Sequence, residues 1–308
     1  MQSVHVEAIE LVAPERRIER IHALPVLPTA VRQLLDVHHD SRRSRAGCQL
    51  LLDSNPQLQS QLATCVRLLG GTVCRDASSI RMVDIQGLDL DEVPEIMLAL
   101  AAARPFSYVC NGPLGAHAFW HHAFCNAAMC FRLASEVEAS PSPRAGTAFL
   151  AGLLHNIGFM VIGYVFPPEF RLLNRLFACH PDIPVTILER CVLGLGEAQD
   201  MLDMGHARIG AWLMREWDMP PEIETVTREH HNVGYKGEAA AYCQLVMAVN
   251  SLLNSCGIGD GSASERDTEA LSRIGVDESV ALDALEELFI SPEILNTAVR
   301  ALISHQTG

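Results

Sequence analysis

Apolar side chains recur along this chain at the spacing of helix faces that pack against a core. The clearest stripe follows positions i, i+4, i+7, i+8 and i+11 and consists of Leu58, Leu62, Cys65, Val66 and Leu69. The pair Asn55-Pro56 precedes it and favours a helix start, because asparagine caps free amides and proline needs no amide partner there. Alternation with period two is nearly absent, so the pattern predicts an all-α protein without a sheet of consequence.

Further stripes and loop signals organise the rest of the chain. Two more stripes contain Phe149, Leu150, Leu153, Leu154 and Ile157, and Ile209, Trp212, Leu213 and Trp217. Residues 277–288 and 292–303 predict two amphipathic helices near the C-terminal end. Residues 140–146 predict a loop, and the glycine-rich residues 257–264 predict a linker that leads to those last helices.

Composition narrows the class of protein. The 308 residues are 49% hydrophobic and carry a formal net charge of −14, which disfavours nucleic acid and anionic membrane surfaces as partners. The longest uninterrupted apolar run, Ile96 to Ala103, is too short to span a bilayer, and residues 1–17 do not resemble a secretory signal. Ten cysteines without a C-x-x-C pair are typical of a reducing compartment, so we expect a cytoplasmic protein.

Histidines are the candidate chemistry of the sequence. Of the 13, the most informative lie in predicted helices or at their ends, at His122, His155, His206 and the pair His230-His231. Histidines spread over several helices can converge in a bundle core, where metal sites are built from facing helices. A single histidine on an apolar face is more often a core residue than a ligand, so this interpretation depends on the whole set.

The context of these histidines carries a resemblance to a known family. The relevant stretches, in chain order, are LPVLP (24–28), LLLDSNPQLQSQL (50–62), FWHHAF (119–124), FLAGLLHNIG (149–158), GHARIGAWLMREWDMPPEI (205–223) and REHHN (228–232). As an ordered series over residues 21–254 they resemble the HDOD group of the HD superfamily of metal-dependent phosphohydrolases. The resemblance implies a helical HD-like bundle in two halves, residues 21–110 and 111–254, after a leader segment 1–20 and before a helical appendage 265–308.

Two departures from the family pattern concern the metal ligands. Asn156 follows His155 where the family has a His-Asp pair, and Asn250 stands where a second acid is expected. The resemblance therefore implies a vestigial pocket made of His122, His155, Asn156, His206, His230, His231 and Asn250. Amides cannot bridge two hard cations as carboxylates do. We expect no cofactor, although the histidine cluster could hold a softer transition metal.

The function that the resemblance implies is regulatory rather than catalytic. We expect a signal-transduction module that acts through contacts with other signalling proteins, such as diguanylate cyclases, phosphodiesterases, receiver proteins or kinases. Two alternatives stay open: a phosphohydrolase with a noncanonical histidine-rich metal site, and a nucleotide-binding sensor without turnover. The sequence names neither the partner, the signal nor the oligomeric state.

Overall fold

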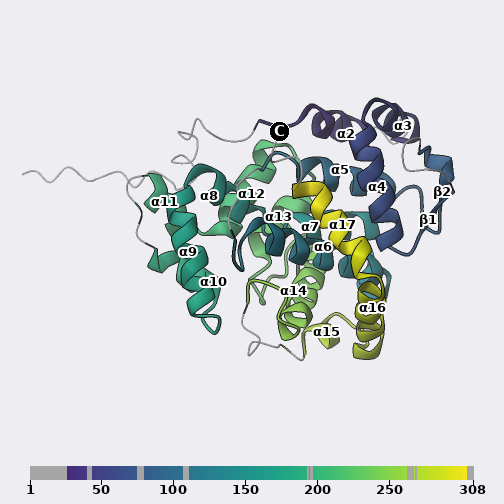
Figure 1. The fold of residues 1–308 in the computed structure, drawn as a ribbon. Helices are drawn as coiled ribbons and strands as arrows, with labels where there is room; N and C mark the ends of the chain where they lie inside the picture. Colours follow the sequence, from purple (N-terminus) through teal and green to yellow (C-terminus); the bar gives the residue numbers. More distant parts are fainter. Residues whose placement is uncertain are drawn as a thin grey trace, which may run out of the picture.

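Helices form almost all the regular structure of the protein, as the apolar spacing predicts (Figure 1). The computed structural model describes residues 26–39, 44–74, 80–106, 111–192, 194, 197–261, 267 and 269–303. The predicted leader segment 1–20 lies outside the described residues. The all-α prediction is confirmed, and the sheet found in the described part of the chain is a single pair of two-residue strands.

The N-terminal helices pack around the first predicted stripe. Their elements are α2 (Thr29–His39), α3 (Ser44–Ser54), α4 (Pro56–Leu68), β1 (Thr72–Val73), η1 (Met82–Asp84), β2 (Ile85–Gln86) and α5 (Val93–Ala102). The side chain of Asn55 accepts a hydrogen bond from the Leu58 amide at 3.1 Å and so caps α4, with Pro56 in its first turn. Leu58 and Leu62 are fully buried, and α4 packs against α5.

The following helices build the part of the fold that holds the histidines. They are α6 (Ala116–Leu133), η2 (Ala134–Glu136), α7 (Ala145–Leu154), α8 (Ile157–Val165), α9 (Pro167–Cys179), α10 (Val185–Cys191), α11 (Glu197–Met204), α12 (His206–Glu216), α13 (Pro221–Glu229) and α14 (Ala240–Ser255). In this part, α6 packs on α7, and α12 packs on α8 and α13. The N-terminal turn of α12 therefore lies next to the junction of α7 and α8.

That junction differs from the continuous stripe expected in the sequence. The α7 helix ends at Leu154 and α8 begins at Ile157, so His155-Asn156 forms a turn between two helices. Gly158 lies so close to α12 that a Cβ there would overlap the carbonyl oxygen of His206. A glycine at this position thus allows the approach of α8 to α12, and this approach carries His155 towards His206.

The segment Ala145–Val165, which contains α7 and α8, is long and apolar enough to cross a membrane. In the fold, however, 89% of its most apolar window is buried against other helices, as in the core helices of globular domains.

The C-terminal helices return to the start of the fold. They are α15 (Ala270–Arg273), α16 (Glu278–Ile290) and α17 (Pro292–Ile303), and Figure 1 shows α17 in yellow across the middle of the molecule. The α17 helix packs against both α4 and α6, and Gln61 donates a hydrogen bond to the carbonyl oxygen of Ala301 at 3.1 Å. The division into two halves and an appendage stays a prediction, but these last helices contact elements from both predicted halves.

Candidate metal pocket

Five histidines from separate parts of the chain meet in one pocket. His122 comes from α6, His155 from the turn between α7 and α8, His206 from the first position of α12, and His230-His231 from the end of α13. Neighbouring rings in this set have centroids 4.2 to 5.4 Å apart. His155 and His206 are fully buried, whereas His231 lies at the exposed mouth. The pocket therefore collects imidazoles where α6, α12, α13 and the turn between α7 and α8 converge.

Hydrogen bonds from the outside of the pocket fix three of the rings. Nδ1 of His155 lies 2.8 Å from the carbonyl oxygen of Gly152, and Nδ1 of His230 lies 2.8 Å from that of Thr227. A carbonyl oxygen only accepts, so Nδ1 carries the proton in both rings and the lone pair of Nε2 faces the pocket. Nδ1 of His206 likewise lies 3.0 Å from a carboxylate oxygen of Glu189, so its Nε2 also points inwards. This is the arrangement by which outer groups orient metal ligands.

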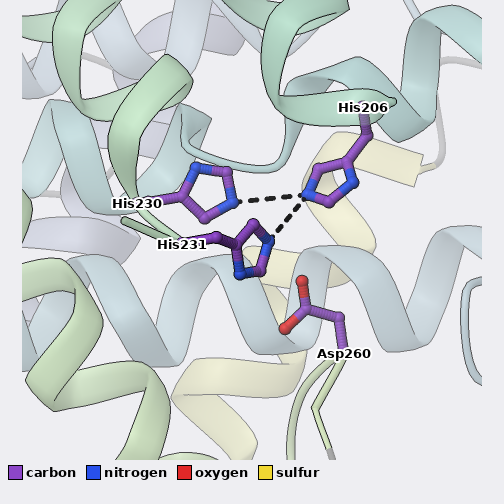
Figure 2. A group of neighbouring side chains, drawn as sticks. All are labelled: His206, His230, His231 and Asp260. Carbon is purple, nitrogen blue, oxygen red and sulfur yellow. Dashed lines mark hydrogen bonds between the residues drawn. The ribbon is translucent and has the colours of Figure 1, made fainter. Parts of the chain in front are cut away.

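Two of these inward nitrogens, those of His206 and His230, form a compact donor set with the ring of His231 and one carboxylate (Figure 2). Nε2 of His206 lies 3.3 Å from Nε2 of His230 and 3.1 Å from Nε2 of His231. With a carboxylate oxygen of Asp260, the ligand atoms all lie within 4.8 Å of one another. Donors about 2.0–2.1 Å from a tetrahedral zinc ion are about 3.4 Å apart. The two nitrogen–nitrogen distances fit that spacing, and imidazole with carboxylate suits transition metals.

Hydrogen bonds fill the other side of the pocket. Nε2 of His155 lies 3.3 Å from Nε2 of His122 and 3.3 Å from the amide nitrogen of Asn250. The amide oxygen of Asn250 accepts a hydrogen bond from Asn126 at 2.7 Å, which turns the Asn250 amide nitrogen towards His155. Because that nitrogen donates, it occupies the lone pair that a metal would need. His155 is thus held as a hydrogen-bond acceptor rather than presented as a ligand.

Asn156 and Asp260 join the two sides. The amide nitrogen of Asn156 donates to Asp260 at 2.8 Å, and its amide oxygen is buried without a hydrogen-bond partner among the described residues. Asp260 lies in the glycine-rich stretch interpreted from sequence as a linker, but it is only 5% exposed and enters the pocket. The pocket therefore contains a carboxylate that is not among the seven residues predicted from sequence, because the loop after α14 folds back and supplies it.

Sequence reasoning also missed Glu189, which orients His206, and Asn126, which orients Asn250. Neither lies in a family motif, and both act through contacts between distant helices. The one available signal for Asp260 was its position between Gly259 and Gly261, a setting in which backbone can turn tightly.

The protonation states follow from burial and neighbouring charges. Burial, together with nearby histidines, lowers the pKa of His155 to about 3 and lowers the pKa of His230 well below its ordinary value. Burial alone would lower the pKa of His206 too, but the Glu189 carboxylate outweighs it and raises that pKa. Burial would raise the pKa of Asp260, yet the surrounding histidines outweigh this and hold it below its usual range. At neutral pH the donor set therefore offers neutral imidazoles at His230 and His231 and an ionised carboxylate at Asp260, whereas Glu189 favours the protonated form of His206, whose inward proton a cation would displace.

A small cavity opens beside this donor set. It has a volume of about 180 Å³, and its lining includes His230, His231, Asn250, Asp260 and Arg273. Sites for drug-sized ligands usually measure about 300–1,000 Å³. The cavity can admit water, an ion or a small anion, but it is too small to enclose a dinucleotide.

All seven residues predicted from sequence lie in or beside this pocket, divided between its two sides. His206, His230 and His231 belong to the donor set with Asp260. His122, His155 and Asn250 form the hydrogen-bonded side, and Asn156 connects that side to Asp260. Their roles stay predictions.

Comparisons with known proteins agree with this architecture. A structure from Marinobacter aquaeolei VT8, provisionally assigned to signal transduction, is 24% identical, with a TM-score of 0.72 over 98% of this chain and 68% of that one. An HDOD domain protein from Geobacter sulfurreducens is 19% identical, with a TM-score of 0.68 over 94% of this chain and 96% of that one. A protein from Shewanella amazonensis SB2B, provisionally assigned as a phosphohydrolase, is 19% identical, with a TM-score of 0.66 over 93% of this chain and 97% of that one. Likeness at these identities establishes the fold.

Sequence comparison adds a family assignment. An uncharacterised protein of Treponema pallidum (strain Nichols) is 32% identical over 91 residues, which span 30% of this chain and only 16% of that protein. The model of the HDOD domain matches residues 24–233, more than half of the chain and most of the region in which the motifs lie. The chain therefore belongs to the HDOD family.

Proposed function

We propose that this chain is a non-catalytic regulatory module of the cytoplasm, which acts by binding other signalling proteins and not nucleic acid. The observation that carries this proposal is the hydrogen bond between the Asn250 amide and Nε2 of His155. It uses a histidine lone pair that a bimetallic phosphohydrolase would give to a cation. Asn156, in the place of the family's aspartate, likewise donates to Asp260 instead of bridging two ions.

The donor set fits one transition-metal ion and does not fit a pair of hard cations. Magnesium and manganese prefer several carboxylate oxygens, and the described pocket supplies one carboxylate directly, from Asp260. Phosphoester hydrolysis by two metals needs both ions to hold the attacking and leaving oxygens. When bound, a single ion would supply a positive charge at His206, His230, His231 and Asp260. The residues of the other side would still hold their hydrogen bonds.

Regulation would follow from the position of the pocket in the fold. Its side chains come from α6, from the turn between α7 and α8, from α12 and α13, and from the loop after α14. A change in the pocket therefore acts on several packed helices at once and can alter the surface that they present. The Marinobacter protein of similar fold, provisionally assigned to signal transduction, supports this class of function.

Turnover and metal content test the proposal together. We expect no measurable hydrolysis of nucleotides or cyclic dinucleotides by the purified chain with added manganese or iron. Turnover that is abolished by His155→Ala, but retained by the exposed-residue control His180→Ala, would overturn the proposal. A pull-down with candidate diguanylate cyclases, phosphodiesterases, receivers and kinases then tests the expected class of partner.

A phosphohydrolase with a single metal ion is the second candidate function. It is favoured by the position of His231 at the mouth of the cavity, where a small phosphoester group could reach the donor set. The same assay separates the two functions, because this candidate requires turnover that is lost in His231→Gln.

A further inference from the structure

We propose that His206, His230, His231 and Asp260 bind a single divalent transition-metal ion, with zinc as the representative, in a closed four-ligand site. We further propose that the ion fastens the loop Gly257–Gly261 to the helical core. This rests on the proposed function in one respect, namely that the asparagine side of the pocket holds no cation. The fourth ligand, the carboxylate of Asp260, lies outside residues 24–233, the stretch that the HDOD model matches.

The imidazoles of His206, His230 and His231 cannot all form hydrogen bonds with one another. Among the described residues, Nε2 of His230 and Nε2 of His231 each have Nε2 of His206 as their polar contact. A proton on His206 can be donated to one of these two nitrogens at a time, so the other lone pair faces His206 unpaired. A cation at the centre accepts all three lone pairs at once, and the 3.1 and 3.3 Å separations leave room for it.

The outer contacts of this set are those that metal-binding histidines use. Glu189 is only 2% exposed, and one of its oxygens accepts hydrogen bonds from both the ring and the backbone amide of His206, at 3.0 and 2.8 Å. The Phe159 ring stacks on His206 with centroids 4.0 Å apart. Gly205 has a φ of 77°, and a Cβ there would come within 3.1 Å of the Glu189 carboxylate. The entry to α12 is thus shaped so that a buried carboxylate can hold His206 in place.

The loop that carries Asp260 is built around that residue. Gly257 and Gly259 have φ values of 74° and 148°, which favour glycine. A Cβ at Gly259 would overlap the amide oxygen of Asn254, and a Cβ at Gly261 would overlap its amide nitrogen. The loop therefore wraps closely around Asn254 at the end of α14, with glycine on both sides of the acid. This fold of the loop places a buried carboxylate beside the histidines and requires glycine at the positions next to it.

Four protein ligands leave no open position on a tetrahedral ion, which is the arrangement of structural rather than catalytic zinc sites. The ligands tie α12 and α13 to the loop after α14, and α15 packs against α14. Binding of the ion should therefore reduce the motion of the loop and of the C-terminal helices that follow it.

Zinc binding to the full chain tests the site. After removal of metal with a chelator, we expect one zinc ion per chain by elemental analysis. We expect a rise in the melting temperature of about 5 °C at a hundredfold excess over Kd. Cobalt(II) should give the intense visible absorption of tetrahedral coordination. Amide hydrogen exchange at residues 257–261 should slow when the ion binds.

Two variants and a control locate the ion. Asp260→Asn keeps the shape of the side chain and should weaken zinc binding at least about 100-fold, since even outer-shell changes cost 10–100-fold. His231→Gln changes an exposed residue and should weaken zinc binding to a similar extent. Asp267→Asn removes a nearby acid that pairs with Arg273 instead, and should bind zinc like the unmodified chain.

Zinc affinity unchanged in both Asp260→Asn and His231→Gln, or an octahedral cobalt spectrum, would overturn the site. Binding of two ions per chain would also overturn the single-ion site. It would contradict the inference that the side of the pocket with Asn156 and Asn250 holds no cation. If the chain binds no zinc and shows no turnover, the metal site is overturned and the proposed regulatory function stands. If the chain binds one zinc ion and shows turnover, only the proposed function is overturned.

Discussion

Replacement of Asn250 by aspartate tests the hydrogen bond that closes the His155 side of the pocket. In the unmodified chain, burial lowers the pKa of His155 to about 3, against a value near 6.5 in an unfolded chain. A depressed histidine pKa means that the unfolded state binds the proton more readily. Stability is therefore lost as the pH falls below about 6.5, by about 1.4 kcal/mol per pH unit for this group.

The new carboxylate reverses that effect. It would lie about 3.3 Å from Nε2 of His155, where the amide nitrogen now lies. A pair of unit charges at that distance attracts by about 5 kcal/mol at an effective dielectric constant of 20, which corresponds to between 3 and 4 pKa units. The pKa of His155 should return to about 6.5, and its acid-dependent loss of stability should disappear.

Urea unfolding at several pH values, with chelator present, measures the result. At pH 7.5 Asn250→Asp should be less stable than the unmodified chain, because a buried carboxylate then faces a neutral ring. Between pH 6.5 and 4.5 the difference should narrow by about 2.7 kcal/mol, two pH units at the slope above. Asn296→Asp on α17 is the control and should keep a constant difference. A constant difference for Asn250→Asp as well would refute the contact between Asn250 and His155.

Three further outcomes follow from the same contacts. Glu189→Gln removes the carboxylate that orients His206 and should weaken zinc binding by about 10–100-fold. Competition with a chromogenic chelator measures the affinity, and an unchanged affinity would contradict this role of Glu189. Gly257→Ala meets no neighbour within 4 Å and should lower the free energy of unfolding by about 1–2 kcal/mol through its positive φ alone, whereas Gly259→Ala must also displace Asn254 and should cost at least about 1 kcal/mol more; equal costs in thermal unfolding would contradict the close fit around Asn254. Leu62→Ala should cost about 2–5 kcal/mol in urea unfolding, since Leu62 is fully buried on α4, and a cost below about 1 kcal/mol would contradict that packing.

The sequence predicted the helices and the histidine pocket for different reasons. Leu58 and Leu62 follow a helical period that depends on local spacing alone, and the structure buries both. His155 and His206 were found through motifs, whose order along the chain indicates a family fold and hence a common pocket. Neither route needed knowledge of distances between helices.

What the sequence could not predict depends on contacts between segments far apart in the chain. The break at His155-Asn156 interrupts an apolar stripe that reads as one helix, and it exists because α8 must approach α12. Asp260 looked like a linker residue, because its burial depends on left-handed glycine conformations and on the fold of the loop around Asn254. Glu189 gave no signal, since its partner His206 lies 17 positions later, on the other side of α11.

The charge balance of the pocket connects these missed residues to the number of ions it can hold. Among the described residues, Asp260 and Glu189 are the buried carboxylates at the donor set, with exposures of 5% and 2%. Two carboxylates with neutral histidines match the charge of one divalent ion. A second divalent ion would leave an excess of two positive charges beside the neutral amides of Asn156 and Asn250. Unbalanced charge is costly in a buried site, so the two carboxylates of this pocket suit a single divalent ion rather than a pair.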